Sequence, residues 1–167
     1  MRLSKHFICF ALTLSMASAA LADAKPWDFY RGSDAYAAGD YKKAMEIWLD
    51  SAQQGSEKAQ FMVGKMFFYG EGVVKNYDFA MKWYSLSAKQ GNSSAQFMMG
   101  MMYGQGKGVV RDNIRAYLWY SVAAANGFFG AGNLRDDLEK SMSSEDVSKA
   151  QAMASECISS GYGDCGQ

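Results

Sequence analysis

Two apolar segments separated by a glycine-containing break form the clearest hydrophobic pattern in the chain. Residues 59–69 carry apolar side chains at the spacing of one face of a helix, Gly70-Glu71-Gly72 interrupts this pattern, and residues 77–90 resume it. A short glycine-rich interruption between two periodic segments is typical of two helices that fold back on each other. The pattern therefore predicts a helical hairpin.

The hairpin pattern is repeated along the chain. A shift of 36 residues aligns residues 41–74 with residues 77–110 at 17 identical positions, and a partial third copy continues to Ala131. Arg135 and Asp136 then break the pattern. Self-similarity at this period is typical of helical repeat proteins, so we expect an all-α array of about four helical hairpins. The expected helices cover residues 27–38, 41–53, 56–69, 76–90, 92–104, 112–126, 129–140 and 143–160.

Local capping signals support these boundaries. Asn76 and Asp112 are good N-caps directly before second helices of hairpins, and Gly55, Gly91 and Gly127 stand where a left-handed C-terminal cap is expected. The last helix opens with residues 143–146, Ser-Ser-Glu-Asp, which resemble a capping box, and it is more polar than the others. It is therefore expected to close the array as a solubilising helical cap.

The first residues have the composition of a secretory signal peptide. Arg2, Lys5 and His6 form a charged start, residues 7–16 an apolar run, and small residues crowd residues 17–24. Residues 1–22 are the predicted signal peptide, with cleavage as late as residue 24 as the alternative. A membrane anchor is disfavoured because the apolar run is too short to cross a bilayer.

Removal of this segment leaves a nearly neutral chain with an even pair of cysteines. The whole sequence has 17 basic and 17 acidic residues, and no basic stripe of the kind that nucleic-acid phosphates require. Cys9 leaves with the signal peptide, so that Cys157 and Cys165 are expected to form a disulfide in an oxidising compartment, with free thiols as the alternative. We expect a periplasmic or secreted protein.

The repeat resembles a known family, the Sel-one-like repeat, a relative of the tetratricopeptide repeat. Its pattern of alanine, glycine and aromatic positions stands here as Ala95, Met99, Gly100, Tyr103, Gly106, Gly108, Val109, Ala116, Trp119, Tyr120, Ala124 and Gly127, with methionine at residue 99 in place of the family's leucine. The resemblance covers nearly all of residues 25–167. It implies a right-handed α-solenoid with repeats near residues 27–55, 56–91, 92–127 and 128–160. The expected disulfide would staple the tail over residues 157–167.

The resemblance also implies where a partner would bind. The first helix of each hairpin is expected to line a concave face that takes protein or peptide ligands, as in the adaptors, scaffolds and regulators of the family. The positions on this face are Phe29, Ser33, Tyr36, Phe61, Lys65, Phe68, Tyr69, Phe97, Met101 and Gln105. The alternative for Phe61, Met62, Met66, Phe97, Met98 and Met102 is that they belong to the core between helices.

Catalytic patterns are weak. The only histidine, His6, lies in the predicted signal peptide, so that the remaining chain has no imidazole for a hydrolytic triad. Residues 104–108, Gly-Gln-Gly-Lys-Gly, lack the spacing of a phosphate-binding loop and indicate an interhelical turn. Some cysteine-rich members of the family have been linked to penicillin binding, but this chain has no Ser-x-x-Lys sequence.

The function predicted from these observations is that of a non-catalytic periplasmic binding protein without a cofactor or metal. Its partner is expected to be a protein or peptide, and a sharper version makes that partner a toxic or lytic envelope enzyme that the chain inhibits. A carboxylate-dependent enzyme acting on cell-wall glycans is the alternative, with Asp136, Asp137 and Glu139, or Glu145 and Asp146, as its acids. Binding of a β-lactam is a further alternative.

Overall fold

The computed structural model describes residues 26–163 and 165, and the predicted signal peptide lies outside these residues. In the described part, eight α-helices and no strand are present. Each expected helix is found, and each end lies within two residues of its predicted position. The helices are α1 (Pro26–Ala37), α2 (Tyr41–Gln53), α3 (Glu57–Tyr69), α4 (Tyr77–Ala88), α5 (Ser93–Gln105), α6 (Asn113–Ala125), α7 (Ala131–Glu139) and α8 (Ser144–Ser159).

Side-chain caps explain why the boundaries are so well defined. Asn76 and Asp112 each accept a hydrogen bond from the backbone N–H three residues later, as predicted for the starts of α4 and α6. Ser143 accepts from the N–H of Asp146 and donates its hydroxyl to the Asp146 carboxylate at 2.9 Å. The glycines after α2, α4 and α6 have positive φ. The predicted N-caps and the glycine ends are thus confirmed, and Ser143 and Asp146 cap α8 through these two bonds.

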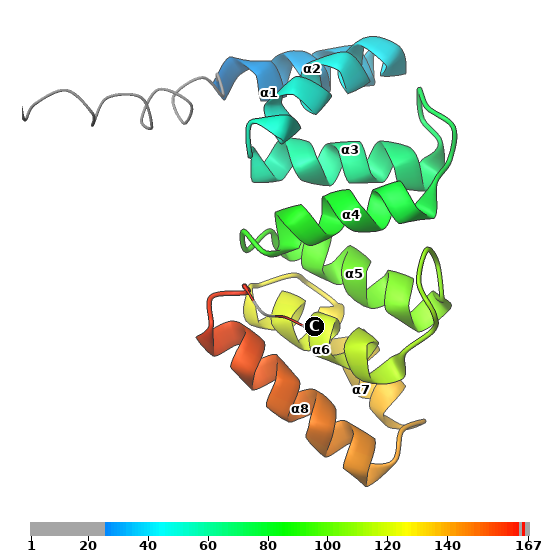
Figure 1. Cartoon of the computed structure of the whole chain (residues 1–167), viewed down its shortest axis with the longest axis vertical. Coiled ribbons are helices and arrows are strands. Elements are labelled where there is room, and N and C mark those ends of the chain that lie inside the picture. Colours follow the sequence, from blue (N-terminus) through cyan, green and yellow to red (C-terminus); the bar gives the residue numbers. More distant parts are fainter. Residues whose placement is uncertain (1–25, 164, 166–167) are drawn as a thin grey trace, which may run out of the picture.

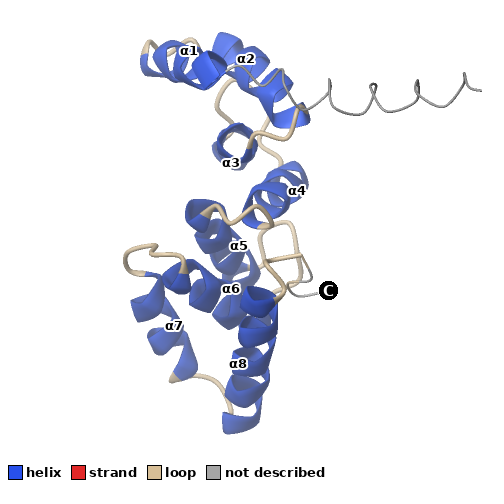
Figure 2. Cartoon of the chain, turned by 90° about the vertical axis from the view of Figure 1, so that its left-hand side faces the viewer, coloured by secondary structure: helices blue, strands red, loops and turns tan. Residues whose placement is uncertain are grey.

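The helices are stacked in one direction to form an open solenoid (Figure 1). Three hairpins, α1–α2, α3–α4 and α5–α6, pack in order, and each second helix also contacts the first helix of the next hairpin. In the view of Figure 2, α5 and α7 lie toward one side of the stack, whereas α4 and α8 lie toward the other. The all-α solenoid predicted from the repeat is therefore confirmed.

The fourth hairpin, however, is not built like the other three. Both α7 and α8 pack mainly against α6, and α8 takes a place beside α6 instead of pairing closely with α7 (Figure 1). The contact face of α8 is formed by the small residues Ala150 and Ala154 and by Cys157, all of which are buried. The structure thus has three closely paired hairpins and a looser fourth pair, α7 and α8, which ends the array with the helical cap that the sequence predicted.

Two glycines in the first helices allow close contact between the partners of a hairpin. A Cβ on Gly64 would lie 2.7 Å from the Tyr84 ring, and one on Gly100 would lie 2.7 Å from the Tyr120 ring. Such distances are too short for any side chain at the glycine. The tyrosines of the second helices therefore occupy the space that a larger residue in the first helix would need.

A second pair of glycines joins neighbouring hairpins. Gly72, in the loop between α3 and α4, packs on the backbone at Tyr41, where α2 of the preceding hairpin begins, and a Cβ there would lie 2.8 Å from the Tyr41 carbonyl oxygen. Gly108 packs on the backbone at Tyr77 in the same way. Both glycines have positive φ. We call each of these contacts a glycine clasp.

The hydrophobic core forms two clusters, one around α2 and α3 and one around α4, α5, α6 and the end of α8. Met66, Met98 and Met102 are buried between helices, and they thus belong to the core, as the alternative interpretation of the methionines proposed. Large aromatic side chains fill the rest, among them Trp48, Tyr84 and Trp119, each at most 2% exposed. Aromatic and methionine side chains of this size give a short solenoid a continuous core.

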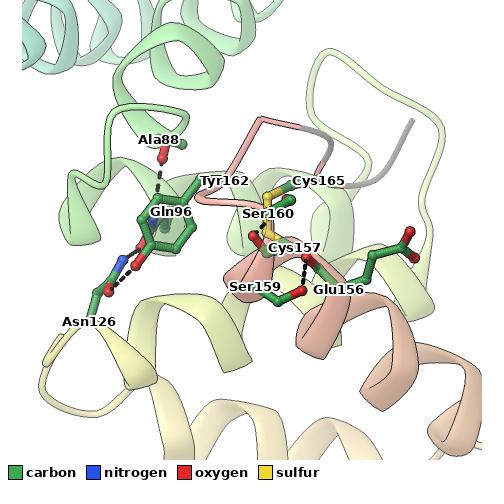
Figure 3. Close-up of a disulfide and its surroundings, with 9 residues drawn as sticks. All are labelled: Ala88, Gln96, Asn126, Glu156, Cys157, Ser159, Ser160, Tyr162 and Cys165. Carbon is green, nitrogen blue, oxygen red and sulfur yellow. Dashed lines mark hydrogen bonds between the residues drawn. A yellow bond between two sulfur atoms is a disulfide. The ribbon is translucent and has the colours of Figure 1, made fainter.

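The disulfide between Cys157 and Cys165 is present, as predicted, and both cysteines are buried in the second cluster (Figure 3). It closes a loop in which Gly161 and Tyr162 have positive φ. The Tyr162 hydroxyl donates to Asn126 at 2.7 Å, and Asn126 donates to the buried Gln96 at 2.8 Å. The stapled tail thereby covers the end of α6 and the turn before α5.

The buried amide in this chain of hydrogen bonds also follows the repeat. Gln96 donates to the carbonyl oxygen of Ala88, and Gln60, its counterpart 36 residues earlier, donates to that of Ala52. Gln90 donates to Gln60 as Asn126 donates to Gln96. A buried amide needs such partners, and here it connects each first helix to the end of the preceding second helix.

Candidate functional site

Two parallel rows of side chains face each other across α1 and α3. Phe29 and Tyr36 stand seven residues apart on α1, and Lys58 and Lys65 stand seven residues apart on α3, so that each pair lies on one side of its helix. The ammonium of Lys58 lies 5.9 Å from the centroid of the Phe29 ring, and that of Lys65 lies 4.7 Å from the centroid of the Tyr36 ring. Both contacts have the geometry of cation–π interactions.

The row on α3 continues past the two lysines. Phe61 is partly exposed between Lys58 and Lys65, and Tyr69, at the end of the helix, is 52% exposed. The spacing of Lys58, Phe61, Lys65 and Tyr69 corresponds to one narrow stripe of a helix surface. We call this set, together with Phe29 and Tyr36 on α1, the α3 strip.

Tyr36 is fixed within the strip by a hydrogen bond. Its hydroxyl donates to the Glu71 carboxylate at 2.7 Å, and Glu71 belongs to the loop that follows α3. Burial and this hydrogen bond raise the pKa of Tyr36 well above its usual value, so that the phenol stays protonated and donating at neutral pH. The tyrosine therefore connects α1 to the α3–α4 loop and presents the face of its ring to Lys65.

The third hairpin continues this surface with more apolar side chains. Phe97 on α5 stacks on Phe128, from the turn after α6, with ring centroids 4.3 Å apart and an interplanar angle of 15°. Met101 is partly buried and Gln105 is exposed. The Phe128 ring covers one face of Phe97, whereas the position equivalent to Phe128 after α4 is Asn92. Phe61 is therefore not covered by an aromatic ring at that position.

Two of the predicted site residues have other roles. Phe68 is only 5% exposed and packs on Tyr69, Tyr77 and Tyr84 in the core, so it offers almost no surface to a partner. The phenyl group is buried because α3 ends beside the start of α4. Ser33 donates its hydroxyl to the carbonyl oxygen of Phe29 within its own helix, and this bond occupies the donor that a ligand would use.

The structure thus brings Phe29, Tyr36, Phe61, Lys65 and Tyr69 together in one surface. The sequence prediction did not include Lys58, Glu71, Lys107 or Phe128, although each is in contact with a predicted residue or its neighbour. The ammonium of Lys107 lies 5.1 Å from the Phe68 ring centroid and 5.7 Å from that of Tyr77. The seven-residue spacing of Lys58 and Lys65 could have identified Lys58.

Acidic groups that could have supplied glycosidase chemistry are engaged elsewhere. Asp136 pairs with Arg135 and Asp137 with Lys140, each at 2.6 Å, and Glu139 accepts from the Tyr117 hydroxyl at 3.0 Å. The Asp146 carboxylate accepts a hydrogen bond from the hydroxyl of Ser143, the N-cap of α8. These contacts assign structural roles to most of the acids considered for catalysis.

Two further structural features bear on the kind of site present. Among residues 26–163 and 165, no three histidine, cysteine, aspartate or glutamate side chains gather as metal ligands would. None of the helices described is long and apolar enough to cross a membrane. Residues 104–108 form the end of α5 and the turn that follows it, as the sequence indicated.

The fold is shared with solved structures. A protective antigen of uropathogenic Escherichia coli that displays an SLR fold superposes with a TM-score of 0.78 and 28% identity, over 84% of this chain and 32% of that one. A Sel1 repeat protein from Oxalobacter formigenes superposes with a TM-score of 0.63 and 32% identity, over 66% of this chain and 45% of that one. The chain spans less than half the length of either protein. No curated protein matches it.

The helical hairpins, the glycine clasps and these superpositions define the chain as an α-solenoid repeat protein. Residues 57–92 and 93–128 match the Sel1 repeat, each one residue later than the boundary expected from the sequence. The chain therefore contains two Sel1 repeats and has solved structural neighbours with the Sel1-like repeat fold, as the resemblance indicated. Proteins of this family generally mediate protein–protein interactions, and they are typically scaffolds without catalytic activity.

Proposed function

We propose that this protein is an exported, periplasmic adaptor that holds a protein or peptide on the surface formed by α1, α3 and α5. The observation that carries the proposal is the α3 strip, in which Phe61 and Tyr69 remain accessible although the core between the helices is filled. In a solenoid, the first helices of successive hairpins form a continuous binding surface. Partly exposed aromatic side chains are typical centres of binding energy on such a surface.

We further propose that the partner is a toxic or lytic enzyme of the envelope, which this protein inhibits by forming a one-to-one complex with it. The N-terminal pattern of a signal peptide supports a place in the periplasm, because it resembles that of exported proteins. The short array supports capture of a single partner, because three hairpins offer a surface of the size used by one protein–protein contact.

Affinity capture from envelope extracts tests this function. The purified protein, with its disulfide intact, is expected to retain one dominant partner in stoichiometric amount, identified by mass spectrometry. A double variant with Phe61→Asp and Phe97→Asp is expected to lose that partner, because charges would be placed in the apolar part of the surface. Unfolding midpoints of the variant and the natural protein are compared first, so that loss of fold is recognised.

The control is Leu86→Asp, which places one such charge on an exposed apolar position of α4. It should retain the partner. Equal retention by the double variant would show that another face binds, and an empty capture with the natural protein would contradict the adaptor function. Inhibition of an enzymatic activity of the captured partner would separate the inhibitor from a passive scaffold.

A further inference from the structure

Three lysines in or next to the α3 strip form no ion pair with a carboxylate of the described residues. Lys58, Lys65 and Lys107 each lie over an aromatic ring. The ion pairs that the structure does contain are local contacts of Arg31, Arg115, Arg135 and Lys140. Other lysines in the described part of the chain also lack an ion pair, but Lys58 and Lys65 differ from them because each lies over an aromatic ring of α1.

The repeat itself does not require these lysines. In the next copy, Ser94 replaces Lys58 and Met101 replaces Lys65, and in the preceding copy Glu71 stands where Lys107 does. Helices α3 and α5 nevertheless have the same length, a side-chain N-cap at the equivalent position and a glycine C-cap. A residue that differs between copies of the repeat is not required for the fold, and it can therefore contribute to binding a ligand.

The nearby carboxylates are already engaged. Glu71 accepts the hydrogen bond from Tyr36, and Asp28 pairs with Arg31 at 3.1 Å. An aromatic ring attracts an ammonium without neutralising it, so the lysine keeps its charge and its N–H donors. Lys58 and Lys65 are thus held in place over α1 while they remain able to bind an anion.

We propose, on the basis of the protein-binding function above, that the α3 strip selects a partner segment in which acidic side chains flank an apolar one. Seven residues of helix place Lys58 and Lys65 about 10 Å apart, with Phe61 between them. Carboxylates at that distance stand seven residues apart on a helix or three residues apart on an extended strand. The apolar residue between them contacts Phe61 and the rings of α1.

Selection from a library of random 16-residue peptides displayed on phage tests this inference with the purified protein. Selected peptides are expected to be enriched in aspartate and glutamate at spacings of three or seven around a large apolar residue. A synthetic copy of the best peptide is then compared, by fluorescence anisotropy, with a copy whose acids are replaced by their amides. We expect the amide copy to bind about tenfold more weakly.

The protein variants distinguish the α3 strip from a general effect of charge. The double variant K58Q/K65Q is expected to bind the acidic peptide about tenfold more weakly, because two exposed charge contacts are lost. The control K42Q/K82Q removes the same charge from exposed positions of α2 and α4, and it should bind as the natural protein does. Equal losses in the two double variants would overturn the assignment to α3.

The remaining outcomes separate this inference from the function on which it rests. Selected peptides without acidic residues would contradict the inference and leave a protein-binding surface in place. Selection of no peptide at all would count against both. Binding to vesicles of phosphatidylglycerol is measured last. If the protein binds these vesicles through Lys58 and Lys65 but binds no peptide, the strip is a lipid site and the proposal is wrong.

Discussion

Tyr36 and Tyr84 are both enclosed by aromatic neighbours, but their hydroxyl groups are in opposite situations. The Tyr36 hydroxyl donates to Glu71, whereas that of Tyr84 is buried without a hydrogen-bond partner among the described residues. Burial raises the pKa of Tyr84 far above its usual value, and the nearby Tyr69 and Glu71 raise it further, so that it stays neutral. A buried hydroxyl without a partner costs free energy.

Removal of the two hydroxyl groups should therefore have opposite effects on stability. We expect Tyr84→Phe to leave the free energy of unfolding unchanged or raise it by up to about 1 kcal/mol, because an unsatisfied group is lost. Tyr36→Phe should lower it by about 0.5–1.5 kcal/mol, because the bond to Glu71 is lost. Urea unfolding followed by circular dichroism measures both. A Tyr84→Phe protein as destabilised as Tyr36→Phe would indicate an unrecognised partner for the buried hydroxyl.

The glycines of the first helices give a second test at the scale of single residues. Gly64→Ala should destabilise the protein by about 1–3 kcal/mol, because its methyl group would overlap the buried Tyr84 ring. Gly132→Ala is the matched control on α7, since the nearest atom to its Cβ is an arginine nitrogen at 3.9 Å. The control should be neutral or stabilising, because alanine favours the helix more than glycine does. Thermal unfolding of both variants measures these changes in stability.

At the scale of the helix, contacts between residues close in the sequence were easier to predict than contacts between different helices. The starts of α4 and α6 followed from Asn76 and Asp112 because a cap is a contact within three residues. The contact of Lys58 with Phe29 joins two helices, and no local rule of helix formation specifies it. The burial of Phe68 depends on Tyr77 and Tyr84 from the next helix, and sequence position alone placed it wrongly on the binding surface.

The position of α8 could not be predicted from nearby sequence either. Its cap and length were predicted, but its packing on α6 depends on the small faces of Ala150 and Ala154 and on the stapled tail. The polar last helix was expected to close the array, but only the structure shows that it does so by packing beside α6 and not by pairing with α7. The cysteine pair predicted the staple because an exported chain with two cysteines has one simple pairing.

Loss of the disulfide should loosen one end of the molecule and leave the other intact. In a Cys157→Ala/Cys165→Ala variant, we expect the free energy of unfolding to fall by about 2–4 kcal/mol. Hydrogen exchange should accelerate in α8 and near Gly91, against which the Tyr162 ring packs, but not in α1 or α2. The natural protein with its disulfide reduced provides the control. Uniform acceleration in all helices would show that the solenoid unfolds as one cooperative unit.

At the scale of the whole molecule, export is the prediction with the most direct measurement. When expressed with its own N-terminal residues, the protein should be recovered from the periplasmic fraction, and its intact mass should correspond to a chain beginning at Asp23 or Lys25. The mass should also be lower by two hydrogens because of the disulfide between Cys157 and Cys165. A full-length, reduced protein confined to the cytoplasm would contradict both the signal peptide and the periplasmic proposal.

The glycine clasps also define an order in which the hairpins can pack on each other. Tyr41 precedes Gly72, and Tyr77 precedes Gly108, so that the backbone that receives a clasp is always synthesised before the loop that closes on it. A chain that emerges from a narrow channel with its N-terminus first can therefore dock each hairpin on one already in place, without waiting for its last residues. The stack can grow as it is threaded through, and only the stapled tail must await the end of the chain.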